Sequence, residues 1–121
     1  MAEEKQEHFT LCDDVTGCEI CGMDKIDADG NPTGGYATGT GLDIVWQDGP
    51  LGRGDGRVEP SGAFVESVLL ACAHRLEFYE ESKFACEANQ VALGHIRKAL
   101  DALRARRRER EARGVQGTYE V

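Results

Sequence analysis

The chain has 121 residues, of which 30% are charged and 40% hydrophobic, and its formal net charge is −8 at pH 7. This length fits one domain with at most a small appendage, and the acidity argues against binding along a long nucleic-acid backbone. The chain contains no run of eighteen apolar residues to span a membrane and no signal-peptide pattern at its start, so we expect a cytoplasmic protein.

Residues 1–41 are rich in glycine and aspartate and are expected to form a separate N-terminal segment, with residues 24–36 as a solvated turn. This segment carries His8, Cys12, Cys18 and Cys21, and the last two have Cys-x-x-Cys spacing followed by glycine, as in a zinc knuckle. Zinc sites normally pair two such elements, and only one is present. A zinc site and reduced thiols in a flexible tail therefore both remain open, and no other cofactor is expected.

Residues 42–121 are predicted to form a second region. Residues 42–47 favour a short β-strand, which Asp48, Gly49 and Pro50 would end. Apolar spacing then predicts one helix after Ser61, which would cap it, and a longer helix over residues 84–113 that ends before Gly114. The expected fold class is mainly α: an antiparallel two-helix hairpin preceded by a short strand and the Gly/Asp-rich segment. Because two helices alone bury too little core, we expect an oligomeric helical assembly.

The end of the longer helix concentrates positive charge, with six arginines against two glutamates over residues 104–113. A solvated helix end with internal ion pairs is one interpretation of this pattern. The other is an anion site, because the arginine fork suits phosphate and the following residues offer backbone N–H groups, a hydroxyl at Thr118 and an aromatic face at Tyr119. His8, His74 and His95 are scattered and form no recognisable catalytic pattern, so no enzyme is predicted.

Several segments of the chain resemble a known family. They read IVWQDGPLG, RLEFYEE, FACEANQVALGHIRKALDALRARRRERE and ARGVQGTY. This order is similar to that of the phage cyclic nucleotide sponges, which disarm the CBASS and Thoeris defence systems. The resemblance covers residues 42–120, and the closing ARGVQGTY is its most specific part.

The resemblance implies a non-enzymatic phage protein of the host cytoplasm that sequesters a cyclic di- or trinucleotide or a cyclic ADP-ribose isomer. It implies a homo-oligomer, a hexamer in the better understood members, with pockets between subunits. The ligand-binding positions carried over are Asn89, Arg106, Arg110, Arg113, Gly114, Gly117, Thr118 and Tyr119. Arg107, Gln116 and Tyr119 depart from the family pattern. The alternative function is a phage structural, assembly or nucleic-acid-associated accessory protein that uses the helices only to oligomerise.

Overall fold

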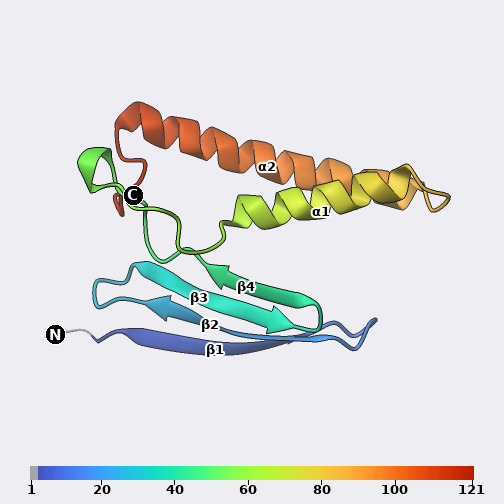
Figure 1. Cartoon of the computed structure of the whole chain (residues 1–121), viewed down its shortest axis with the longest axis horizontal. Coiled ribbons are helices and arrows are strands. Elements are labelled where there is room, and N and C mark those ends of the chain that lie inside the picture. The colour runs from blue at the N-terminus through green and yellow to red at the C-terminus, as the bar shows by residue number, and fades with distance from the viewer. Residues whose placement is uncertain (1–2) are drawn as a thin grey trace. The chain divides into compact units, whose positions relative to one another are not determined.

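The computed structural model describes residues 3–121 and contains one four-stranded sheet and two α-helices (Figure 1). The strands are β1 at Lys5–Cys12, β2 at Glu19–Ile26, β3 at Pro32–Gly39 and β4 at Leu42–Trp46. A 3-10 turn at Gly54–Gly56 precedes helices α1 at Val65–Glu80 and α2 at Glu87–Arg113. The prediction of a mainly α-helical chain with one short strand is therefore wrong, and the fold class is α+β.

The chain forms two compact units. The first contains residues 3–63 and the C-terminal residues 117–121, and the second contains residues 64–116. All four strands belong to the first unit and both helices to the second. The strand predicted at residues 42–47 is β4, and it pairs with β3 through a two-residue turn at residues 40–41. β1, β2 and β3, which lie within residues 5–39, thus share one sheet with β4.

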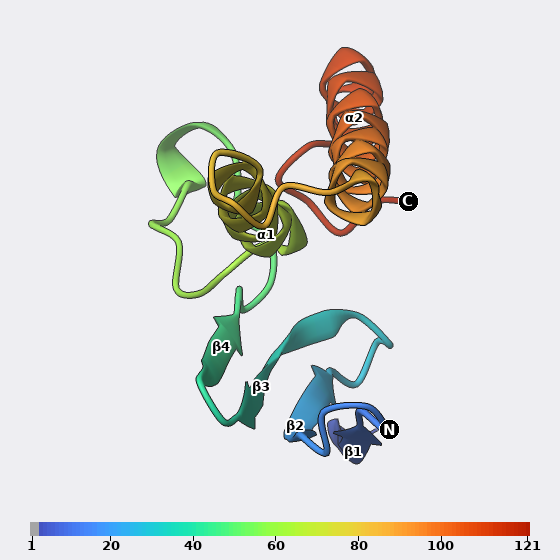
Figure 2. The ribbon, with the colours of Figure 1, turned by 90° about the vertical axis from the view of Figure 1, so that its right-hand side faces the viewer.

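The sheet is built from consecutive antiparallel hairpins in the order β1-β2-β3-β4 (Figure 2). Aspartates close its first two turns, where the Asp13 carboxylate accepts the N–H of Val15 and the Asp27 carboxylate accepts the N–H of Asn31, both at 2.9 Å. These N–H donors stabilise the carboxylates and lower the pKa of each. The prediction that residues 24–36 form one long turn is wrong, because only residues 27–31 lie between β2 and β3.

One row of paired residues crosses the sheet from Phe9 through Gly22 and Ala37 to Ile44. Gly22 and Ala37 are buried. A Cβ atom on Gly22 would lie 2.1 Å from the Tyr36 carbonyl oxygen and 2.3 Å from the Phe9 ring, so no larger residue fits there. Gly22 therefore permits close packing between neighbouring strands. The abundance of glycine in residues 1–41 had instead suggested turns.

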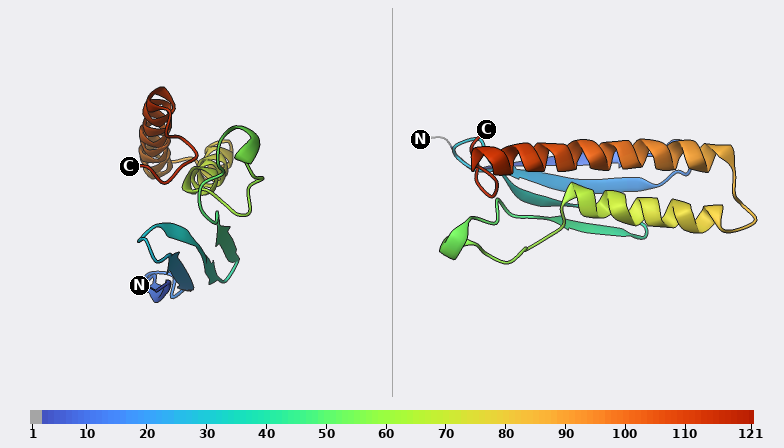
Figure 3. Two further views of the ribbon diagram at one scale, coloured as in Figure 1. Left: turned by 90° about the vertical axis from the view of Figure 1, so that its left-hand side faces the viewer. Right: turned by 90° about the horizontal axis from the view of Figure 1, so that it is seen from above.

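In the second unit, α1 and α2 pack against each other and are joined by residues 81–86 (Figure 3). Ala73 on α1 and Leu93 and Leu100 on α2 are buried. An ion pair of 2.9 Å between Glu77 and Arg97 also connects the two helices. Neither helix is long and apolar enough to cross a membrane, and the described part of the chain contains no other candidate.

The start of α1 differs from the predicted cap. Phe64, not Ser61, occupies the N-cap of α1, and it makes no side-chain capping bond. Ser61 instead belongs to the first unit, where its hydroxyl accepts the N–H of Asp48 at 3.2 Å. Before α2, the Glu80 carboxylate accepts the N–H of Cys86 at 3.0 Å, which lowers the pKa of Glu80.

Candidate functional site

The arginines at the end of α2 divide into paired and unpaired side chains. Arg107 forms an ion pair with Glu111 at 3.2 Å, and Arg113 pairs with Glu109, where Nη2 and Oε2 are also 3.2 Å apart. Both pairs are solvent-exposed at i,i+4 spacing, so each contributes only about 0.3–0.5 kcal/mol to stability. With six arginines against two glutamates over residues 104–113, this helix end stays positively charged even with both pairs formed.

Three of the arginines are exposed and lie outside these two ion pairs. Arg104, Arg106 and Arg108 are exposed, and among residues 3–121 they make no ion pair. Guanidinium groups that are solvated and unpaired can donate two parallel hydrogen bonds to a phosphate without first breaking an internal contact. Among the predicted ligand residues, Arg106 is therefore the side chain best placed to receive an anion.

Arg110 has a different environment from its neighbours on α2. It is only 6% exposed, and its Nη2 donates to the carbonyl oxygen of Val115 at 3.0 Å. The N–H of Val115 donates in turn to the Arg110 carbonyl oxygen at 3.0 Å, and Gly114 between them takes the left-handed conformation with φ 75°. This arrangement ends the helix, with Gly114 as the predicted stop. Arg110 therefore stabilises the C-terminal end of α2 through its hydrogen bond to Val115.

The last three predicted ligand residues, Gly117, Thr118 and Tyr119, lie in the first unit. The Gly117 carbonyl oxygen accepts the N–H of Gly52 at 3.0 Å, and the Tyr119 hydroxyl donates to the Pro32 carbonyl oxygen at 3.0 Å. The Thr118 hydroxyl accepts the N–H of Glu120 at 3.2 Å. These bonds hold the C-terminal residues beside the sheet turns.

The Tyr119 side chain has an anchored hydroxyl and a partly free ring. Burial raises the pKa of the Tyr119 hydroxyl above its ordinary value, and the carboxylates of Asp27 and Asp48 raise it further. The side chain is still 42% exposed, which leaves part of the ring open to solvent. Stacking of a ligand base on this ring stays a prediction. The hydrogen bond from the Tyr119 hydroxyl to Pro32 was not predicted from the sequence.

Asn89 lies in the first turn of α2, far from the arginines. Its Nδ2 donates to the Phe84 carbonyl oxygen at 3.3 Å and so helps to close the turn before the helix. Seventeen residues separate Asn89 from Arg106, which places them ~25 Å apart along the helix. Within the second unit, only Arg106, Arg110, Arg113 and Gly114 are therefore brought to one helix end.

The predicted metal ligands are distributed along the sheet. His8 pairs with Met23, Thr10 with Cys21, and Cys12 with Glu19, so His8, Cys12 and Cys21 share a face but occupy successive rows. Cys18 lies in the turn before β2, and all five thiols are free and exposed. No group of three or more metal-ligating side chains comes together in the described chain. The ladder spacing explains this, because zinc needs all its ligands within about 2.0–2.3 Å of one point.

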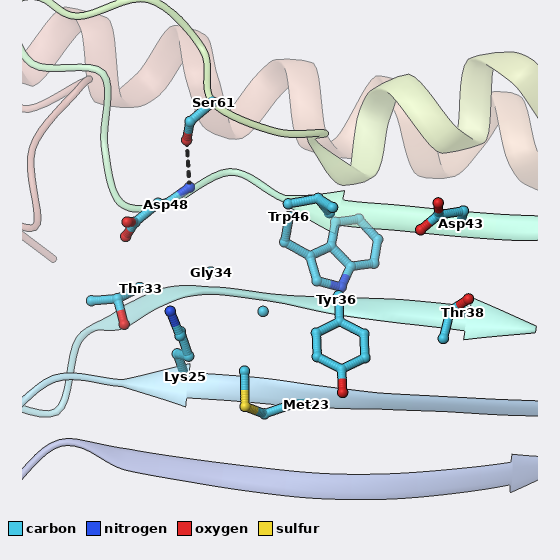
Figure 4. A pocket seen from close by; sticks show the side chains of 12 residues that line it. Met23, Lys25, Thr33, Gly34, Tyr36, Thr38, Asp43, Trp46, Asp48 and Ser61 are labelled. Carbon is cyan, nitrogen blue, oxygen red and sulfur yellow. Dashed lines mark hydrogen bonds between the residues drawn. The ribbon is translucent and has the colours of Figure 1, made fainter.

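A shallow concavity of about 460 Å³ lies over β2, β3 and β4 (Figure 4). Its lining includes the ammonium of Lys25, the carboxylates of Asp43 and Asp48, the Met23 thioether and the Tyr36 ring, which is 38% exposed. The sequence did not predict this concavity, because β4 was the only one of its three strands that was expected. The signal that could have found it is the run of β-favouring residues in LDIVW, which needs neighbouring strands to pair with.

Comparison with known proteins identifies a local match to a phage protein. The chain is 37% identical over 60 residues to Thoeris anti-defense 1 of Bacillus phage SBSphiJ7. Half of this chain is similar to a phage anti-defence protein. The matched residues are 50% of the chain and 42% of that relative, so the chain spans less than half of the relative's length in the match. No family model matches the chain.

Proposed function

We propose that this chain is a phage counter-defence protein that binds a cyclic nucleotide signal of the host and sequesters it without cleaving it. The local similarity to Thoeris anti-defense 1 supports the counter-defence role. In this proposal the protein acts in the host cytoplasm. The ligand is a cyclic di- or trinucleotide or a cyclic ADP-ribose isomer.

The observation that carries the ligand chemistry is the group of unpaired arginines at the end of α2. Arg104, Arg106 and Arg108 are exposed in a protein whose overall charge is −8. A local group of cations in an otherwise acidic protein favours binding of a small anion. A long nucleic acid would also have to lie along the acidic surface. A compact cyclic phosphodiester fits this requirement.

Sequestration in pockets between subunits is consistent with the dimensions of α2. Asn89 and Arg106 are ~25 Å apart along the helix and cannot contact one small ligand from the same helix. A second copy running in the opposite direction would bring Asn89 of one subunit near Arg106 of the other. The proposed binding unit is therefore a homo-oligomer, as the sequence resemblance implies.

The absence of cleavage is part of the proposal. His8 lies on β1, His74 on α1 and His95 on α2, so the histidines are divided among three elements. A sponge requires only tight binding, which arginine and backbone donors supply without a general acid or base. A ligand recovered chemically unchanged would be the signature of this mechanism.

The test compares two arginines one position apart. Arg106→Ala should abolish binding of the active cyclic nucleotide in isothermal titration, because it removes an unpaired donor. Arg107→Ala is the matched control, since it removes the same charge from a side chain that already pairs with Glu111. Equal affinity in Arg106→Ala and the unaltered protein would contradict the proposed site.

A second candidate function is supported by exposed apolar side chains on α1. Leu70 is 48% exposed and Phe78 is 53% exposed, which leaves apolar side chains for contact with another protein. A phage structural, assembly or nucleic-acid-associated accessory protein would use them to oligomerise and would bind no cyclic nucleotide. Titration with cyclic di- and trinucleotides and cyclic ADP-ribose isomers distinguishes the two functions, because only the sponge should bind one of them.

A further inference from the structure

The C-terminal residues belong to the first unit although they follow the helices in the sequence. The chain leaves this unit after residue 63, forms α1 and α2, and returns to it with residues 117–121. Gly117 and Thr118, two of the predicted ligand residues, lie at this return. The neighbours that order them therefore include the loops of the sheet.

The backbone of Gly117 fits closely against the loop that follows β4. The Gly52 N–H donates to the Gly117 carbonyl oxygen at 3.0 Å. Gly117 has φ 83°, and a Cβ atom there would lie 2.5 Å from the Gly52 carbonyl oxygen. A larger residue would therefore have to move one of the two segments. Glycine at position 117 thus allows the direct contact with Gly52.

The Tyr119 hydroxyl lies against two further loops of the first unit. It donates to the carbonyl oxygen of Pro32, the first residue of β3, at 3.0 Å. Gly49, in the loop after β4, also lies next to it, since a Cβ atom on Gly49 would be 2.7 Å from the hydroxyl oxygen. The first unit therefore supplies both an acceptor and the space for this hydroxyl.

Thr118 lies between these two contacts. Its hydroxyl accepts the N–H of Glu120 at 3.2 Å, which closes a turn over residues 118–120. Gly52 holds the residue before Thr118, and Pro32 holds the residue after it. The backbone and hydroxyl of Thr118 therefore have a defined direction before a ligand arrives.

We infer that Tyr119 is a positioning residue of the proposed ligand site: its hydroxyl bond to Pro32 holds Gly117 and Thr118 in the conformation that receives the nucleotide. The inference rests on the proposed function and gives Tyr119 a role distinct from stacking on a base. A loop that is already ordered loses little conformational entropy on binding, so the affinity of its site is higher.

Substitution separates the hydroxyl of Tyr119 from its ring. Tyr119→Phe keeps the ring, and with it any stacking, but loses the bond to Pro32. Isothermal titration of the full chain with cyclic dinucleotides, cyclic trinucleotides and cyclic ADP-ribose isomers identifies the one that binds. Its affinity for Tyr119→Phe should be about three- to tenfold lower than for the unaltered protein, the range for one net hydrogen bond.

Tyr79→Phe is the matched control. It removes a tyrosine hydroxyl that accepts a hydrogen bond from Arg75 at 3.1 Å on α1, and it should bind the nucleotide as tightly as the unaltered protein. If Tyr119→Phe also binds as tightly as the unaltered protein, the positioning role is overturned.

A double-mutant cycle with Thr118 shows whether Tyr119 acts through this loop. Thr118→Ala removes the hydroxyl that Tyr119 is inferred to position. In the Thr118→Ala background, Tyr119→Phe should therefore weaken nucleotide binding by a smaller factor than in the unaltered chain. The same factor in both backgrounds would mean that the two residues act independently, and it would overturn the inference.

Hydrogen exchange separates failure of this inference from failure of the proposed function. In the protein without nucleotide, Tyr119→Phe should speed exchange of the Gly52 N–H, which donates to Gly117, and leave exchange at Leu100 in α2 unchanged. An unchanged rate at Gly52 would overturn the inference. If the unaltered protein binds none of the nucleotides, the proposed function is contradicted, and the role of Tyr119 falls with it.

Discussion

In the sheet the most buried positions are Gly22 and Ala37, whereas in the helices they include Leu93 and Leu100. The first unit therefore depends on small residues that let neighbouring strands and an aromatic ring approach closely. The second unit depends on aliphatic side chains between two helices. The difference teaches that a glycine-rich, weakly apolar segment can still be a regular sheet when its few large residues cover its small ones.

Deleting one large side chain from each region gives the largest expected difference. Leu100→Ala should lower the free energy of unfolding by about 2–5 kcal/mol, because it removes a side chain that is 3% exposed and leaves a cavity. Ile44→Ala should cost only about 1 kcal/mol, because Ile44 is half-buried. Urea unfolding measures both. Equal losses would show that the sheet has a core as tight as that of the helices.

The same glycine substitution should have opposite signs in the two regions. Gly22→Ala should destabilise by roughly 1–3 kcal/mol, because its new methyl group meets the Tyr36 carbonyl oxygen and the Phe9 ring. Gly94→Ala should stabilise by about 0.5–1 kcal/mol, because no atom outside the local helix backbone lies within 4 Å of its new methyl group and alanine favours a helix. Thermal unfolding of the two variants tests this, and a shift of the same sign in both would refute the comparison.

Removing one arginine side chain at a time sharpens the comparison within α2. Arg110→Ala should destabilise by about 1.5–3 kcal/mol, because it removes a buried charged donor to the Val115 carbonyl oxygen. Arg106→Ala, an exposed substitution, should change stability by less than about 0.5 kcal/mol. Chemical unfolding measures both, and a stability loss in Arg106→Ala as large as that in Arg110→Ala would make Arg106 structural.

The smallest effect concerns a sheet turn at low pH. The N–H of Asn31 lowers the pKa of Asp27 in the folded state. A depressed folded-state pKa contributes stability above the unfolded-state pKa, and that stability is lost as pH falls through the folded-state value. Below about pH 4, stability should therefore fall less steeply with pH in Asp27→Asn than in the unaltered protein. If the stabilities of the two proteins fall equally steeply with pH in acid, the Asp27 carboxylate does not stabilise this turn.

Local patterns in the sequence predicted some elements and missed others for identifiable reasons. Periodic apolar residues and a glycine stop indicated the longer helix, which the structure places at Glu87–Arg113. Three of the four strands were missed because β1 to β3 contain few β-branched residues and several glycines, whose role depends on the neighbouring strand. Gly22 illustrates this, since only its neighbours on the two adjacent strands, the Phe9 ring and the Tyr36 carbonyl oxygen, show why glycine is required.

The sequence predicted which residue types form the candidate site, but not which of their side chains are buried or hydrogen-bonded. The sequence indicated an arginine surplus in α2, and the structure distinguishes exposed Arg106 from buried Arg110. Helical spacing alone could not separate them, because the burial of Arg110 depends on the chain reversal at Gly114 that brings the Val115 carbonyl oxygen within reach. The anchoring of the Tyr119 hydroxyl by Pro32 depends on a contact between residues 87 positions apart in the sequence.

Recovery of a bound cyclic nucleotide tests the proposed sequestration most directly. Purified protein is screened by thermal unfolding against cyclic di- and trinucleotides and cyclic ADP-ribose isomers at physiological salt. A ligand at a hundred times its dissociation constant should stabilise the protein by ~2.7 kcal/mol, and heat denaturation should release that ligand chemically intact. A panel with no stabilising ligand, or a ligand released only as a cleaved product, would contradict sequestration.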